Sequence, residues 1–137
     1  MIKKNIQHIA ITLETGNRLN LLVELHDDGL IKRLGSGDPQ LTDPDLYMGK
    51  TSPSLFFTLL QQVSDELLAR SGAYRLPDPE GEPVTLRLLF AGDNDSSELT
   101  FIYGTESLSP PLEVQNLVAG AVDLTEEWYR SQHQPLE

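Results

Sequence analysis

The chain of 137 residues contains no cysteine. This absence excludes a disulfide framework, a thiol nucleophile and a cysteine-ligated zinc site. It fits a reducing compartment, and we therefore expect a cytoplasmic protein.

Long apolar runs are also missing. After the basic start Met1–Lys4, the segment Asn5–Ile9 is interrupted by polar residues and is not expected to form the apolar core of a signal peptide. No run reaches the roughly 20 apolar residues that a membrane-spanning helix needs. These patterns predict a soluble protein that does not associate with membranes.

Basic residues are scarce, with ten against 21 acidic residues and a net charge of −11. Between Leu76 and Tyr129 the chain has eleven acids, and Arg87 is the one base. Such a surface repels nucleic-acid phosphates and anionic membranes, and it attracts a basic protein partner. The alternative is that the acidity only keeps a bacterial-type protein in solution.

The strand pattern is clear in two parts of the chain. Apolar residues alternate with polar ones in segments 7–13, 19–25, 30–34, 84–90 and 99–103. The length and an apolar fraction of 39% are enough for one core, so residues 1–137 are expected to form a single α+β domain.

Two helices with continuous apolar stripes follow these strands. The first is predicted to begin at Ser52-Pro53 and to end before Gly72, and the second to begin after Ser109-Pro110-Pro111. The element order is βββα-ββα. Because every link between strands has hairpin length, we expect a five-stranded antiparallel sheet with two helices packed on one face.

The first hairpin has a predictable register. Keeping the apolar residues of both strands on one face, with a three-residue loop, places His8 directly opposite His26. Two imidazoles with Glu24 nearby are the beginning of a zinc site, but no further ligand is evident, so a solvent-exposed pair without metal is expected. Glu24 is expected to face Lys32 or Arg33 of the third strand.

The sheet face opposite the helices mixes apolar and charged side chains. A face in contact with water alone would be nearly all polar, so we interpret this one as a contact surface. The alternative is that scattered surface aliphatic residues are normal. The predicted interaction face consists of His8, Ala10, Leu22, Glu24, His26, Arg87, Leu89 and Ile102.

Motifs of known catalytic or cofactor sites are incomplete in this sequence. Gly49-Lys50-Thr51 has the end of a phosphate-binding loop, but the first glycine of that motif is missing. Asp93 and Asp95 have the first spacing of a calcium loop, but Gly104 stands where the closing glutamate belongs. We therefore predict no catalytic residues, no cofactor and no metal.

The element order and the acidity are similar to the core of the acidic, dimeric chaperones of bacterial type III secretion, which bind proteins without ATP. The resemblance covers those two properties, and the chaperones begin with a helix that is not predicted here. It implies a protein partner and, as one alternative, a homodimer through the open sheet face. An acidic immunity protein that neutralises a basic bacterial toxin has the same features.

Two classes of function follow. The first is a non-enzymatic protein-interaction module, either chaperone-like or toxin-neutralising. The second is a small enzyme or ligand-binding domain with a site between the sheet and loops 36–51 and 72–83. A deep pocket lined by carboxylates would favour the enzyme, whereas a flat and partly apolar open face would favour the interaction module.

Overall fold

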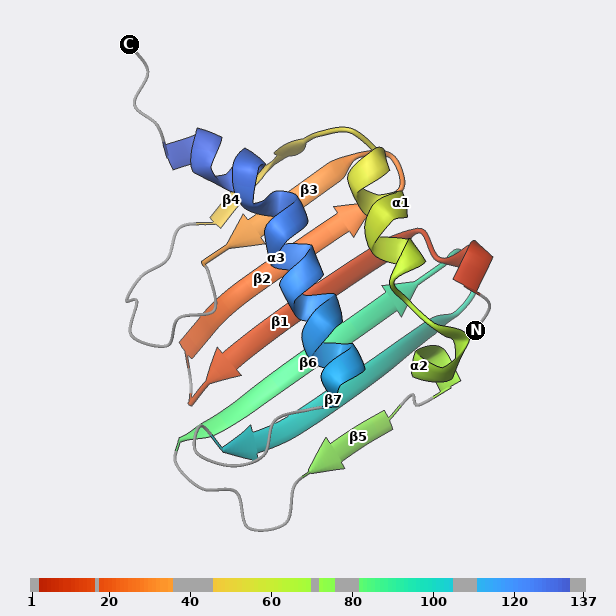
Figure 1. The fold of residues 1–137 in the computed structure, drawn as a ribbon, viewed down its shortest axis with the longest axis vertical. Helices are drawn as coiled ribbons and strands as arrows, with labels where there is room; N and C mark the ends of the chain where they lie inside the picture. Colours follow the sequence, from red (N-terminus) through yellow and green to blue (C-terminus); the bar gives the residue numbers. More distant parts are fainter. Residues whose placement is uncertain are drawn as a thin grey trace.

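The computed structural model describes residues 3–16, 18–35, 46–69, 72–75, 82–104 and 111–133 (Figure 1). The elements in chain order are η1 (Lys3–Asn5), β1 (His8–Thr15), β2 (Arg18–His26), β3 (Leu30–Leu34), β4 (Leu46–Lys50), α1 (Ser54–Gln61), α2 (Asp65–Ala69), β5 (Gly72–Arg75), β6 (Pro83–Ala91), β7 (Ser96–Gly104) and α3 (Leu112–His133). None of the helices within these residues combines the length and the apolar character that crossing a membrane requires.

One sheet contains the seven strands in the order β4-β3-β2-β1-β6-β7-β5. The first six strands in this order pair antiparallel with their neighbours. Strand β5 lies at the edge and pairs parallel with β7. The α+β class and the antiparallel sheet are confirmed, but the predictions of five strands and of βββα-ββα order are wrong. The element order behind the resemblance to secretion chaperones is therefore not the observed one.

Strand β4 lacks the aliphatic alternation that identifies the central strands. Its positions on the helix side are Tyr47 and Gly49, which pair with Arg33 and Ile31. Trp128 of α3 fills the space above the glycine, since a Cβ atom on Gly49 would lie 3.0 Å from Trp128 Cζ2. A helix residue therefore fills the core above β4. The sequence of β4 lacks the aliphatic residues that would indicate a strand.

The first hairpin has the predicted register, with His8 opposite His26. The turn is shorter than predicted, because Thr15 already pairs with Arg18. A bulge that leaves Asn20 without an opposing residue on β1 compensates for the shorter turn. The two differences cancel, so the same side chains share a face as in the prediction.

The first helical region is two helices and not one. The Ser52 hydroxyl accepts a hydrogen bond from the Ser54 N–H (3.2 Å) where α1 begins. At the start of α2 the Ser64 hydroxyl accepts from the Leu67 N–H (3.0 Å) and donates to Glu113 of α3. Ser64 is thus the cap of a second helix, and it also ties that helix to α3.

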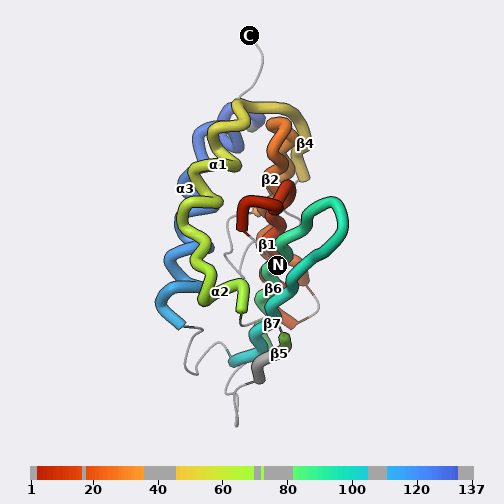
Figure 2. Tube along the Cα trace, turned by 90° about the vertical axis from the view of Figure 1, so that its right-hand side faces the viewer, coloured from red at the N-terminus to blue at the C-terminus, as the bar shows by residue number. Residues whose placement is uncertain are grey.

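All three α-helices lie on one side of the sheet (Figure 2). Helix α1 packs on β1, β2 and α3, and α3 also packs on β2. The core residues between sheet and helices are Ile9, Ile11, Leu21, Val23, Leu25, Ile31, Leu86, Leu88, Phe90, Leu99 and Phe101 from the strands and Phe56, Leu59, Val63, Leu67, Leu68, Val114, Leu117 and Ala121 from the helical layer. No described element covers the other face of the sheet.

The substitution Gly120→Ala is expected to stabilise the fold. A Cβ atom on Gly120, in the middle of α3, would lie 2.4 Å from Gln62 Oε1. Gln62 is exposed, so its amide can swing aside, while alanine favours the helix by about 1 kcal/mol over glycine. The thermal midpoint measured by circular dichroism should rise by roughly 3 °C.

A larger residue provides the control for this prediction. Gly120→Leu should lower the midpoint, because its side chain needs more space than the movement of Gln62 provides. A decrease with alanine as well would show that Gln62 is held in place.

Candidate functional site

The eight residues predicted for the interaction face all lie on the uncovered side of the sheet. Central strand β1 contributes His8 and Ala10, β2 lies on one side of it, and β6 and β7 lie on the other. Ala10 on β1 is paired with Glu24 of β2 on one side and with Leu89 of β6 on the other. The predicted residues therefore form one continuous surface across β1. Arg87 and Ile102 lie on the β6–β7 side, away from the two histidines on the β1–β2 side.

Leu34, Leu46 and Met48 extend this face beyond the predicted residues, next to the predicted Leu22. Leu22, Leu34 and Leu46 are direct neighbours across β2, β3 and β4, and Met48 follows on β4. Leu46 is 49% exposed and Met48 is 60% exposed. We call these four residues the apolar corner. Three of them were not predicted: no side chain of the third strand was assigned to this face, and β4 itself was not predicted.

A polar cluster of His8, Glu24, His26 and Lys32 borders the apolar corner. The Glu24 carboxylate lies at its centre, with Oε1 3.1 Å from His8 Nε2, and Oε2 3.6 Å from His26 Nε2 and 3.2 Å from Lys32 Nζ. The imidazole rings are stacked, with centroids 4.1 Å apart and planes 14° from parallel. Both histidines are half-buried rather than solvent-exposed, and Lys32 is the base that pairs with Glu24.

The surroundings of the polar cluster favour a neutral imidazole and an ionised carboxylate. Partial burial lowers the pKa of His8, and the adjacent His26 lowers it further, which together outweigh the attraction of Glu24. Burial alone would raise the pKa of Glu24, but Lys32 and His8 together hold it below its usual value. At neutral pH the His8 imidazole is therefore neutral beside a negative Glu24 carboxylate.

Comparison with known proteins gives no assignment. No family model matches the sequence, and no curated protein matches it.

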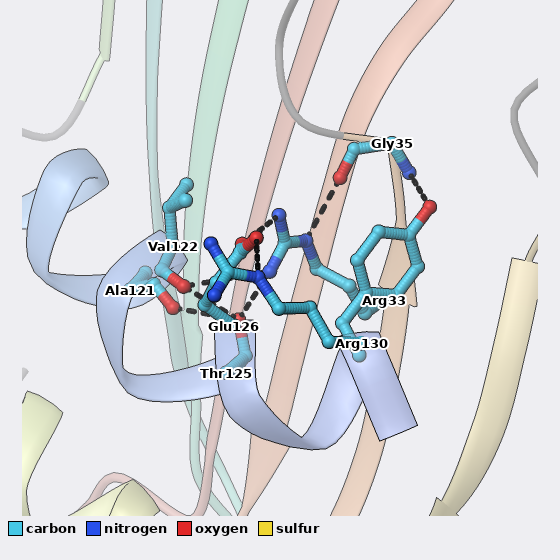
Figure 3. A network of polar contacts seen from close by, with 8 residues as sticks. Arg33, Gly35, Ala121, Val122, Thr125, Glu126 and Arg130 are labelled. Atoms are coloured by element: carbon cyan, nitrogen blue, oxygen red, sulfur yellow. Dashed lines mark hydrogen bonds and ion pairs between the residues drawn. The ribbon is translucent and has the colours of Figure 1, made fainter. Parts of the chain in front are cut away.

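Arg33, next to Lys32 on β3, points to the opposite side and is fully buried (Figure 3). Its Nε donates to the Gly35 carbonyl (2.9 Å), its Nη1 to Thr125 Oγ1 (2.9 Å), and its Nη2 to Glu126 Oε2 (3.1 Å). These bonds join β3 to α3. The alternative prediction that Arg33 faces Glu24 is therefore wrong, because Arg33 is in phase with the core residue Ile31.

Two further side chains complete this network. The guanidinium carbon of Arg33 lies 4.4 Å from the centroid of the Tyr129 ring, and the Tyr129 hydroxyl accepts from the Gly35 N–H (2.9 Å). Arg130 Nε lies 3.2 Å from Glu126 Oε1 on the surface side. Because the donors of Arg33 are used within the fold, the network has a structural role.

A hollow at one end of the sheet has a volume of about 480 Å³. Its lining residues come from η1, α1 and the turns after β2 and β6: Lys4, Asn5, Ile6, Gln7, Asp27, Phe57, Asp93, Asn94 and Asp95. This is not the position predicted for an enzyme site, which was between the sheet and loops 36–51 and 72–83. Much of those loops lies outside the described residues.

Proposed function

We propose that the protein is a protein-interaction module that binds a second copy of itself through the open sheet face. The observation that carries the proposal is the apolar corner, where Leu46 and Met48 are exposed on a face that no described element covers. Large exposed aliphatic side chains that adjoin one another on a sheet are typical of contact surfaces.

The charges on the open face favour a second copy over a partner of one charge sign. Along β1 to β4, β6 and β7 this face carries the acids Glu14, Glu24 and Glu98 and the bases Lys32, Lys50 and Arg87. Acids and bases are balanced here, although the whole chain has a net charge of −11. Two copies of so acidic a protein repel one another over most of their surface, and the balanced face is where that repulsion is smallest.

Ion pairs already formed on this face support a symmetric contact. Glu14 Oε1 lies 3.3 Å from Arg87 Nη1, and Glu24 pairs with Lys32. A twofold axis brings identical patches together, and a patch that contains both charge signs can match itself. Such a dimer leaves the helical layer outside.

The outer helical surface suits a basic protein partner. Near the end of α3 the acids Asp123, Glu126 and Glu127 lie on one surface with Arg130. In a dimer this surface remains free to attract a basic protein, which both the chaperone-like and the toxin-neutralising hypotheses require. The acidic end of α3 is then the binding side, and the open face is the assembly side.

Met48→Asp is expected to weaken dimerisation at least about tenfold. The reason is that a twofold contact buries the new carboxylate twice, next to the other residues of the apolar corner. The measurement is molar mass by size-exclusion chromatography with light scattering over a range of protein concentrations.

Leu112→Asp is the matched control, because Leu112 is 69% exposed at the start of α3 and lies on the helix side. It should dimerise as the unaltered chain does. Ile102→Asp tests the far end of the open face and should weaken association with the fold retained. A chain that stays monomeric at high concentration would contradict the homodimer, as would equal weakening by Leu112→Asp.

A further inference from the structure

We propose that His8, Glu24 and His26 form a binding site for a divalent transition-metal ion such as Zn²⁺ on the open face. This inference stands on the geometry of the polar cluster and does not rest on dimerisation. It replaces the expectation of a histidine pair without a role.

The three side chains present their ligand atoms to one small volume. One ligand atom from each residue can be chosen so that all three lie within 4.8 Å of one another. Zinc binds nitrogen and oxygen at about 2.0–2.2 Å, which sets tetrahedral ligand atoms about 3.4 Å apart. His8 Nε2 and Glu24 Oε1 are already 3.1 Å apart, and His26 Nε2 is 3.6 Å from Glu24 Oε2. Metal binding at this site requires side-chain rotations that bring the two nitrogens and one Glu24 oxygen to this spacing.

The imidazole nitrogens indicate that a partner belongs between them. The Nε2 atoms of His8 and His26 are shielded from solvent, and the Glu24 carboxylate approaches them at 3.1 Å and 3.6 Å. Buried polar nitrogens nearly always have a partner. Two such nitrogens that both approach the same carboxylate are satisfied together by one cation. The lone pairs lie in the ring planes, so the two stacked rings must tilt toward one another for both nitrogens to reach one ion.

The backbone supports these positions. His8 and His26 are directly paired on adjacent central strands, and Glu24 is two residues from His26 on the same face. Ligands on paired strands are held more precisely than ligands on loops. Three protein ligands leave the fourth position of a tetrahedral zinc ion to a water molecule.

Lys32 competes for the same carboxylate. Its Nζ lies 3.2 Å from Glu24 Oε2, where its positive charge opposes the arrival of a second cation. The lysine side chain is long and partly exposed, so it can turn away when a metal binds. Removal of this ammonium group should therefore strengthen metal binding, whereas it would weaken a cluster that is only an ion-pair network.

The test is isothermal titration calorimetry of the full chain with ZnCl₂, in parallel with a thermal melt in zinc. We expect one ion per chain and a melting temperature that rises with zinc concentration. Glu24→Gln and His26→Ala should each weaken zinc binding by at least about tenfold. Lys32→Met should strengthen it about tenfold. His133→Ala, which removes the third histidine of the chain, should change nothing.

Three results would contradict the proposed metal site. The first is the absence of zinc binding at millimolar zinc, the second is equal zinc affinity of Glu24→Gln and the unaltered chain, and the third is weaker zinc binding by Lys32→Met. Circular dichroism of each variant shows whether it is folded. Co²⁺ gives a second readout, since a visible absorption band that is lost in His8→Gln reports the ligand set directly.

Discussion

Leu59→Asp is expected to unfold the protein. Leu59 is completely buried in α1, where that helix packs on β1 and β2. Loss of the leucine side chain alone costs about 2–5 kcal/mol, and an unpaired carboxyl group in the same place costs several more. Together these terms are comparable to the total stability of a small domain, about 5–15 kcal/mol. The near-ultraviolet circular dichroism signal and the cooperative melting transition should both be lost.

Positions on the same helix provide controls for this prediction. Gln61 is exposed, and Gln61→Asp should melt close to the temperature of the unaltered chain. Leu60 belongs to the same apolar stripe in the sequence but is only half-buried, so Leu60→Asp should have an intermediate effect. A Leu59→Asp variant that unfolds cooperatively at the normal temperature would contradict the packing of α1 on the sheet.

Arg33→Met is expected to lower the free energy of unfolding by about 2–3 kcal/mol. The substitution keeps an unbranched side chain in the core but removes the donors to Gly35, Thr125 and Glu126. Glu126 is partly exposed and keeps its contact with Arg130, so the main cost comes from the buried acceptors. The measurement is the midpoint of urea unfolding followed by circular dichroism, at an unchanged slope.

Arg130→Met is the matched control, because Arg130 binds the same glutamate from the solvent side. The Arg130 side chain is 75% exposed, and its removal should cost less than about 0.5 kcal/mol. Equal losses in the two variants would mean that the ion pairs of Glu126, and not the buried bonds of Arg33, hold α3 to β3.

The central part of the fold can be predicted from the sequence with simple rules. Alternation placed Ile9, Ile11 and Val23 on the core side, and together with an assumed three-residue loop it put His8 opposite His26. The prediction held although the turn is shorter, because a bulge at Asn20 restores the phase. A shift by one residue would have turned every core side chain of the strand to the open face. The free-energy cost of exposing these apolar side chains keeps the strands in this register.

The edges of the sheet were not predictable in the same way. Edge strand β4 has Gly49 where a core residue is expected, because Trp128 from α3 occupies that space. Edge strand β5 has four residues and pairs in parallel with β7, a partner that local sequence does not indicate. Such strands depend on contacts from distant parts of the chain, and single-strand patterns do not contain that information.

The sequence by itself determined the α+β class, the register of the first hairpin and the eight residues predicted for the open face, because period-two alternation fixes which side chains share a face and a short turn limits how the two strands can pair. Only the tertiary structure decided which other side chains lie next to these residues. It joined the apolar corner to the face, paired Glu24 with Lys32, and turned Arg33 into the core. These outcomes depend on how β3, β4 and α3 meet, and contacts between segments far apart in the chain are set by the packing of the whole fold.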